Sequence, residues 1–115
     1  MGIKTWVNGK LFDKDEASIN AYDHGFLYGD GVFEGIRIYN GRIFRFSEHI
    51  DRFFDSLLVT RIDIGMDRES LKTQIIKVCQ ENEHYDRAYI RLVASRGVGD
   101  LGINPRKCRN GATVV

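Results

Sequence analysis

Two Asn-Gly pairs, each set between alternating polar and apolar residues, constrain the fold of this chain more than any other feature. The first is Asn8-Gly9 in the stretch TWVNGKLF, and the second is Asn40-Gly41 between GVFEGIRIY and RIFRF. An Asn-Gly pair tolerates positive φ at both centres of a two-residue turn, which makes it the strongest short signal for a β-hairpin. The sequence therefore predicts two hairpins, separated by a loop that runs to about Asp23.

Two amphipathic helices are predicted after the hairpins. The first carries an apolar stripe at helical spacing and has Ser47 in position to cap its N-terminus; the stripe is Ile50, Phe53, Phe54, Leu57 and Leu58. The second is capped by Asp67 and has the stripe Leu71, Ile75, Val78 and Cys79. Each stripe needs an apolar surface to cover, so we expect both helices to pack on a sheet.

The remaining sequence completes the predicted fold class. RAYIRLVASR alternates like a strand, GVGDLGINPRKCRNG is typical of an irregular loop, and GATVV is typical of a buried strand. We predict an α+β domain with a mostly antiparallel sheet, built from two hairpins plus later strands, and two helices packed on one face. Because natural domains seldom finish on such a run, we expect the sequence to stop mid-protein; a true C-terminal strand is the alternative.

Composition narrows the classes of partner. A chain of 115 residues is enough for one domain, and its formal charge of +1 gives no field to attract nucleic acid. The sequence predicts no membrane or secretory segment, and we expect a cytoplasmic protein with reduced thiols at Cys79 and Cys108, one disulfide being the alternative. The scattered His and Cys residues predict no metal site. Arginine supplies 11 of the 17 basic residues, which favours small anionic ligands.

Strand alternation gathers the arginines and tyrosines on one surface. Arg37 and Tyr39 share a face of one predicted strand, and Tyr89 and Arg91 share a face of another. Opposite faces carry apolar residues that should meet the helices. An aromatic wall with two guanidiniums is a plausible cradle for a small carboxylate ligand. The alternative is that cross-strand pairs only stabilise the sheet.

Three other polar residues are interpreted as structural. Asp30 and Glu34 are four positions apart with no second feature to support paired-carboxylate chemistry, so we interpret them as solvated or turn-capping groups. His24 is assigned to loop structure rather than to chemistry.

The stretches YGDGVFEGIRIYNGRIFRFSEHIDRFFDS and AYIRLVASRGVGDLGINPRKC closely resemble the branched-chain amino-acid aminotransferases. These are class IV, fold-type IV pyridoxal-phosphate enzymes, a class that also holds D-amino-acid aminotransferase and aminodeoxychorismate lyase. The resemblance runs from VNGKLF to the last residue and implies an N-terminal small domain spanning residues 1–115. It also implies pyridoxal 5′-phosphate as cofactor, amino acids and 2-oxo acids as substrates, and a homodimer or higher homo-oligomer.

The same resemblance implies roles for individual residues. Arg52 matches the arginine that binds the cofactor phosphate. The other matched positions belong to the substrate pocket: Phe33 and Gly35 as its wall, with Gly35 leaving room for a branched side chain; Tyr28 and Ile103 closing it from a neighbouring subunit; Tyr89 fixing the α-carboxylate; and Arg37 and Arg91 accepting the second carboxylate of glutamate.

The residue that defines activity in this family has no match here. Transamination needs a lysine that forms a Schiff base with the cofactor, and in the family it lies in the C-terminal domain. We therefore expect no catalytic residue within residues 1–115 and no activity from this segment alone. The alternatives are a stand-alone, non-catalytic binding or assembly module, and a fragment of a D-amino-acid aminotransferase or aminodeoxychorismate lyase.

Overall fold

The first predicted hairpin is confirmed in the computed structural model, which describes residues 2–108 and 111–115. Strands β1 (Lys4–Val7) and β2 (Lys10–Asp13) pair antiparallel around Asn8 and Gly9, whose φ angles are 49° and 95°. This hairpin forms a two-stranded sheet of its own. Its turn bonds to the last strand: Asn8 N donates to Val114 O at 2.9 Å, and Val114 N donates to Asn8 Oδ1 at 2.7 Å.

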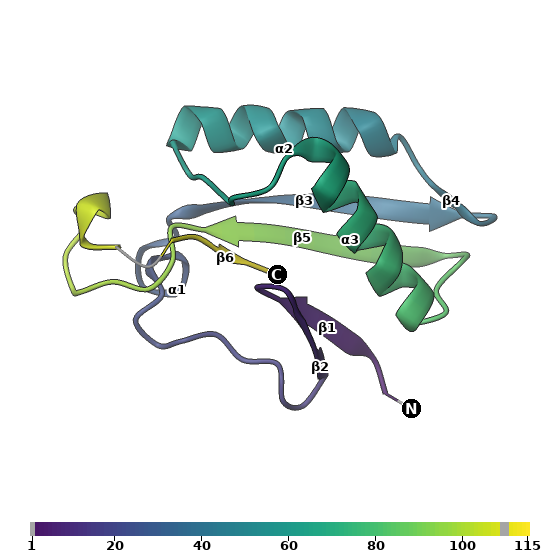
Figure 1. Cartoon of the computed structure of the whole chain (residues 1–115), viewed down its shortest axis with the longest axis horizontal. Coiled ribbons are helices and arrows are strands. Elements are labelled where there is room, and N and C mark those ends of the chain that lie inside the picture. The colour runs from purple at the N-terminus through teal and green to yellow at the C-terminus, as the bar shows by residue number, and fades with distance from the viewer. Residues whose placement is uncertain (1, 109–110) are drawn as a thin grey trace.

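The main sheet has four antiparallel strands in the order β4-β3-β5-β6 (Figure 1). The strands β3 (Gly31–Tyr39) and β5 (Ala88–Ser95) pair along their length, from Gly31 opposite Ser95 to Ile38 opposite Ala88. The second hairpin is confirmed at Asn40-Gly41, although β4 spans only Arg42–Ile43. The strand β6 (Thr113–Val114) pairs with the end of β5. The α+β class is confirmed, with the first hairpin set apart from the main sheet.

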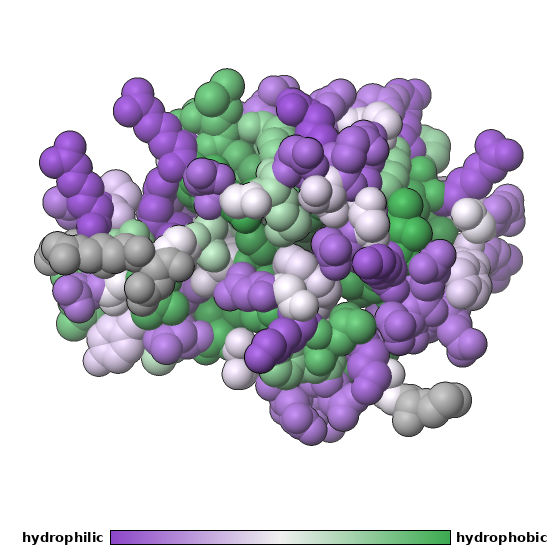
Figure 2. Space-filling model, viewed as in Figure 1, coloured by the Kyte–Doolittle hydropathy of each residue, from purple (hydrophilic) through white to green (hydrophobic). Residues whose placement is uncertain are grey.

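Two long helices, α2 (Phe46–Thr60) and α3 (Arg68–Glu81), pack on one face of the main sheet (Figure 1). Together with the inward side of the strands they enclose a single apolar core, whose buried members include Ile50, Phe53, Leu57, Leu71, Ile75, Leu92, Ala94 and Val114. Seen from this helical side, the surface is mostly hydrophilic with apolar residues showing between the polar ones (Figure 2). None of the helices formed by the described residues has the length and apolarity to cross a membrane.

The helix termini confirm one predicted cap and correct another. Asp67 caps α3 and accepts a hydrogen bond from Ser70 N at 2.8 Å. By contrast, α2 begins at Phe46 with Arg45 as N-cap in the left-handed conformation, so the prediction of Ser47 as cap is wrong. Ser47 lies inside the helix, and its Oγ accepts from Lys72 Nζ at 3.1 Å. Leu58 was predicted to face the core, but it is 78% exposed. The buried side of α2 is narrower than predicted and consists of Ile50, Phe53 and Leu57.

A short helix, α1 (His24–Tyr28), and a 3₁₀ turn, η1 (Pro105–Lys107), lie at one end of the molecule (Figure 1). The helix α1 is capped by the Asp23 side chain and ends at Gly29, which has a φ of 68°. A β-bridge between Asp23 and Val98 ties this region to the loop after β5. The segment with Asp23 and α1 and the loop from Val98 to η1 therefore form one structural unit, which we call the α1 end.

Candidate functional site

Alternate residues of β3 and β5 face away from the helices and form the open face of the sheet. The open face carries Phe33, Gly35, Arg37 and Tyr39 from β3 and Tyr89, Arg91 and Val93 from β5. Phe33 is 57% exposed and Tyr89 50% exposed, whereas Ile36 on the opposite face is fully buried. The predicted sharing of one face by these residues is confirmed. Their roles toward a ligand stay predictions.

Contacts across the two strands hold the aromatic and basic groups together. The Arg91 guanidinium lies over the Phe33 ring, 3.9 Å from its centroid, and the Arg37 guanidinium lies 5.3 Å from the Tyr89 centroid. Arg91 Nη1 also donates to Tyr89 Oη at 3.2 Å. Each ring therefore has a cation over its face, and no carboxylate of the described residues pairs with either arginine. Both guanidiniums remain available to an anionic ligand.

Gly35 accommodates Tyr89. A Cβ at position 35 would meet the Tyr89 hydroxyl and would lie 3.0 Å from Tyr89 Cζ and 3.1 Å from Cε2. The space directly beside this glycine is thus filled by the Tyr89 side chain, while the role of Gly35 toward a branched substrate, which the resemblance implies, stays a prediction. Since a side chain at position 35 would displace Tyr89, the glycine determines where the Tyr89 hydroxyl lies. In that position the hydroxyl accepts a hydrogen bond from Arg91.

A shallow pocket of about 420 Å³ lies between the open face and the α1 end. It is bordered by apolar and small residues of β3, β5 and α1, which include Phe33, Val93, Phe26, Gly29 and Gly31. Phe26 is 74% exposed, so this border is apolar and open to solvent. Apolar surface of this kind is typical of a ligand or subunit contact.

Tyr28 and Ile103 are brought together at the α1 end, away from that pocket. Tyr28 Oη accepts a hydrogen bond from Gly102 N at 2.6 Å, and the neighbouring Ile103 is 81% exposed. Neither residue lines the pocket beside Phe33. Within one chain, therefore, these two predicted residues form a group separate from the open face.

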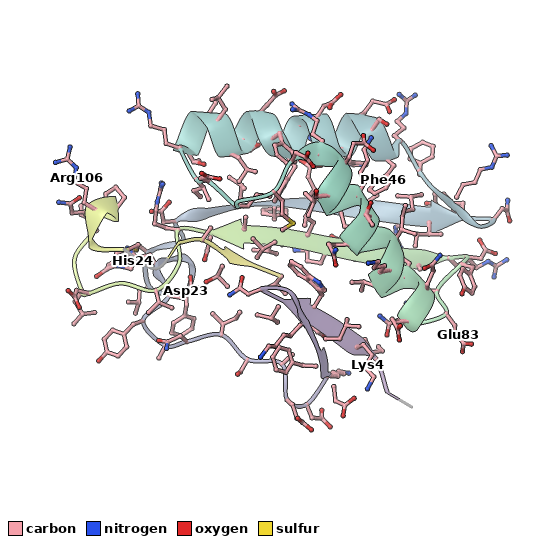
Figure 3. The ribbon with its side chains drawn as sticks, in the orientation of Figure 1. Lys4, Asp23, His24, Phe46, Glu83 and Arg106 are labelled. Carbon is pink, nitrogen blue, oxygen red and sulfur yellow. The ribbon has the colours of Figure 1, made fainter. Side chains whose placement is uncertain are left out.

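Buried polar residues support this group (Figure 3). Asp23 and His24 are 1% and 0% exposed, and His24 Nε2 lies 2.7 Å from Asp100 O. Since a carbonyl oxygen only accepts, Nε2 carries the hydrogen. Asp23 Oδ1 accepts from Ser95 Oγ at 2.6 Å and from Gly25 N at 2.8 Å. His24 thus holds the loop after β5, as the structural interpretation predicted, although it does so from a helix.

Arg52 lies on the helix-covered side of β3, opposite the open face. It is 68% exposed, projects from α2, and forms two parallel hydrogen bonds with Glu34, from Nε to Oε2 and from Nη2 to Oε1, each of 2.8 Å. His49 Nδ1, one helical turn earlier on α2, lies 2.7 Å from the same Oε1. Glu34 itself is 5% exposed. This Arg52–Glu34–His49 cluster is an ionic group buried at its carboxylate end only.

The interpretation of Glu34 as solvated or turn-capping is therefore wrong. The bonds donated by Arg52 lower the pKa of the Glu34 carboxyl from its ordinary value of 4.5, and the bond with His49 acts in the same direction against the effect of burial. Glu34 is thus held as a carboxylate. Alternation had placed it beside Val32 and Ile36 on the core face, and a charged residue on such a face requires partners. That requirement was the signal which could have identified Glu34 and His49.

Asp30 also has an arginine partner and is not simply solvated. Arg96 Nε donates to Asp30 Oδ2 at 2.9 Å and Nη2 donates to Oδ1 at 3.1 Å. The same guanidinium donates to the carbonyl oxygens of Thr60 and Arg61 at 2.8 and 3.0 Å. Arg96 therefore joins the start of β3 to the C-terminal end of α2.

The outer edge of β3 lies between the open face and Arg52. The strand β4 pairs only with Ile38 and Tyr39, and Phe44 N donates to Arg37 O at 2.8 Å. In an antiparallel strand the N–H and C=O of one residue point to the same side, so those of Phe33 and Gly35 also point outward. No strand of the described residues covers this edge from Gly31 to Ile36. A ligand that touches both Arg52 and the open face must therefore pass around this edge of β3.

Comparison with protein families identifies one match. Residues 31–115 match the family model described as amino-transferase class IV. A protein of Methanocaldococcus jannaschii that carries the provisional name of branched-chain-amino-acid aminotransferase is 50% identical over 106 residues, which are 92% of this chain and 36% of that protein. A D-alanine aminotransferase of Bacillus licheniformis is 36% identical over 110 residues, 96% of this chain and 37% of that enzyme.

Solved structures show the same relationship. A branched-chain amino acid aminotransferase from the organism abbreviated T.th., in complex with N-(5′-phosphopyridoxyl)-L-glutamate, superposes with a TM-score of 0.86 at 37% identity. The superposition covers 99% of this chain and 39% of that one. The chain thus spans somewhat more than a third of the length of these relatives.

Proposed function

Because the chain belongs to the class IV aminotransferase family, we propose that the protein carrying it transfers amino groups between branched-chain L-amino acids and 2-oxoglutarate. The family acts on amino acids and 2-oxo acids, and the Methanocaldococcus jannaschii relative named for branched-chain amino acids is 50% identical to this chain, against 36% for the D-alanine aminotransferase of Bacillus licheniformis. We propose that residues 1–115 are its N-terminal small domain, with the lysine-bearing domain outside them. The free thiols of Cys79 and Cys108 support the cytoplasm as its location.

The arrangement of Phe33, Arg37, Tyr89 and Arg91 on the open face is the observation that carries this proposal. In the proposed complex, the Tyr89 hydroxyl binds the substrate α-carboxylate, and Arg37 and Arg91 bind the second carboxylate when glutamate is the donor. The Phe33 ring offers apolar surface to a branched side chain, and Gly35 fixes the position of Tyr89. One surface can thus accept both an apolar and an anionic side chain.

The residues present fit the phosphate end of pyridoxal 5′-phosphate. Arg52 has Nε and Nη2 engaged by Glu34, and its Nη1 has no partner among the described residues, which suits a phosphate oxygen. The cofactor, when bound, supplies the aldehyde carbon that takes up the amino group. Neither β3 nor β5 contains a lysine, and the lysines of the chain lie at positions 4, 10, 14, 72, 77 and 107. The chain's own contribution is therefore binding and orientation of substrate and phosphate.

We propose a homodimer in which Tyr28 and Ile103 of one subunit close the pocket of the other. Their separation from the open face of their own chain and the exposure of Ile103 support this assignment. The hydrogen bond between Tyr28 and Gly102 would hold Tyr28 and Ile103 together as one rigid group against the partner subunit.

Amino transfer with defined donors tests the proposed function. With the protein that carries this chain, pyridoxal 5′-phosphate and 2-oxoglutarate, we expect L-leucine, L-valine and L-isoleucine to form glutamate faster than D-alanine does. Faster reaction with D-alanine would favour a D-amino-acid aminotransferase, and release of pyruvate from aminodeoxychorismate would favour the lyase. Absence of any turnover would favour a non-catalytic module.

A further inference from the structure

We propose that Glu34, steadied by His49, is a positioning residue that holds Arg52 with one guanidinium edge free for the cofactor phosphate, an inference that rests on the function proposed above. It concerns a residue with no contact to the ligand itself. Glu34 is 5% exposed and both of its carboxylate oxygens are engaged, so it acts through the arginine.

The burial of the carboxylate is the first reason. Glu34 lies on the core face of β3, between Val32 and Ile36, where an apolar side chain of similar size would avoid the cost of burying a charge. A buried ion pair is weak evidence for stability, because apolar replacements are often neutral or stabilising. A role for the carboxylate toward its partner explains its presence better than stability does.

The geometry at Arg52 is the second reason. The two parallel bonds of 2.8 Å fix the plane of the guanidinium, and this restricts an otherwise long and mobile side chain. His49 bonds to Oε1, the oxygen that also accepts from Arg52 Nη2, so the carboxylate is held from α2 at two points. With Nε and Nη2 engaged, the Nη1 edge is the part of Arg52 that points away from Glu34.

Electrostatics set the expected character of this site. Glu34 neutralises much of the Arg52 charge, which lowers the general attraction for anions, whereas the fixed plane lowers the entropy lost when a phosphate binds. The pair should therefore favour a directed hydrogen bond over nonspecific charge attraction. The consequence is selectivity: Glu34 should matter for a ligand with a phosphate and not for the same ligand without it.

The experiment compares pyridoxal 5′-phosphate with pyridoxal, which lacks the phosphate. Dissociation constants of both are measured by equilibrium dialysis for the protein that carries this chain and for the variants Glu34→Gln, Glu34→Asp and Arg52→Lys. Gln keeps the shape but turns an amide N–H₂ toward the donors, and Asp keeps the charge but shortens the reach. We expect each Glu34 variant to lower the preference for the phosphate-bearing ligand about tenfold, which corresponds to about 1.4 kcal/mol.

Asp30→Asn is the matched control, because Asp30 is a second carboxylate paired bidentately with an arginine, four residues earlier. We expect it to leave the preference unchanged. In the Arg52→Lys variant, adding Glu34→Gln should not lower the preference for pyridoxal 5′-phosphate over pyridoxal any further, since Glu34 acts through Arg52.

Each other outcome overturns the inference in a recognisable way. If Arg52→Lys lowers the preference and the Glu34 variants do not, Glu34 is not a positioning residue, while the proposed function stands. If the Glu34 variants weaken both ligands equally, their role is structural only. If Arg52→Lys leaves the preference unchanged, Arg52 does not bind the phosphate, and that part of the proposed function fails with the inference.

Discussion

Two arginine–carboxylate pairs of the described residues, Arg96–Asp30 and Arg52–Glu34, have the same bidentate bonding pattern but differ in the exposure of the arginine. In the first pair both side chains are partly buried, Arg96 17% and Asp30 25% exposed, and all three guanidinium nitrogens donate to protein oxygens. In the second the carboxylate is buried and the arginine is 68% exposed with Nη1 unengaged among the described residues. An arginine whose three guanidinium nitrogens all donate within the chain ties elements together, whereas one with a nitrogen left unengaged can bind a ligand.

The largest effect is expected at Arg96, where the comparison predicts loss of stability. Arg96→Ala leaves Asp30 and the carbonyls at the end of α2 without their donor, and we expect the free energy of unfolding to fall by about 3 kcal/mol. Urea denaturation of the protein that carries this chain measures it. A loss near zero would show that Arg96 behaves as a surface ion pair and would remove the contrast with Arg52.

The next effect is expected at Arg52, where the comparison predicts loss of binding. Arg52→Ala should weaken the affinity for pyridoxal 5′-phosphate by about 2 kcal/mol, within the range for hydrogen bonds to charged groups. Its stability loss should be smaller than that of Arg96→Ala, because Glu34 keeps its bond with His49, whereas Arg96 joins a carboxylate and two carbonyl oxygens. Isothermal titration gives the affinity. Unchanged affinity would place Arg52 with Arg96 as a structural residue.

A third arginine sharpens the comparison, since Arg91 has no carboxylate partner among the described residues and stacks on Phe33. Arg91→Leu should lower kcat/KM for glutamate about tenfold, or about 1.4 kcal/mol, and should affect leucine far less. Steady-state kinetics with the two donors test this. Equal losses would mean that Arg91 supports the sheet and does not select the substrate.

The smallest effect concerns pH. The folded protein lowers the pKa of Glu34, so the stability that this carboxylate contributes is fully present above its ordinary value of 4.5 and is lost as the pH falls through its folded pKa. Denaturation at pH 6 and at successively lower pH should show this loss, and Glu34→Gln should reduce it. An identical pH dependence in the variant would show that Glu34 is not a linked group.

The sequence predicted those parts of the fold that depend on neighbours along the chain. Both Asn-Gly turns, the cap at Asp67 and the two faces of β3 follow from local spacing. The prediction of Ser47 as N-cap was wrong because Arg45, in the left-handed conformation, takes that position. No sequence pattern for helix caps predicts an arginine there.

The parts of the candidate site that escaped prediction depend on contacts between distant elements. Glu34 was placed on the correct face, but its partners come from α2, and the position of that helix over β3 is not contained in the alternation of the strand. Likewise, Tyr89 fills the space above Gly35 only because β3 and β5 pair in this register. Residue identity predicted which groups matter, and tertiary structure decides what each one touches.

The bond between Asn8 and Val114 has a consequence for the order of events during biosynthesis. The first hairpin is made before the rest of this chain, and the partner of its turn lies 106 residues later. At about 5–20 residues per second, the hairpin waits roughly 5–20 s before that partner exists. The first hairpin therefore stays undocked from β6 while the residues between them are made, and the rate of translation sets when the two can join.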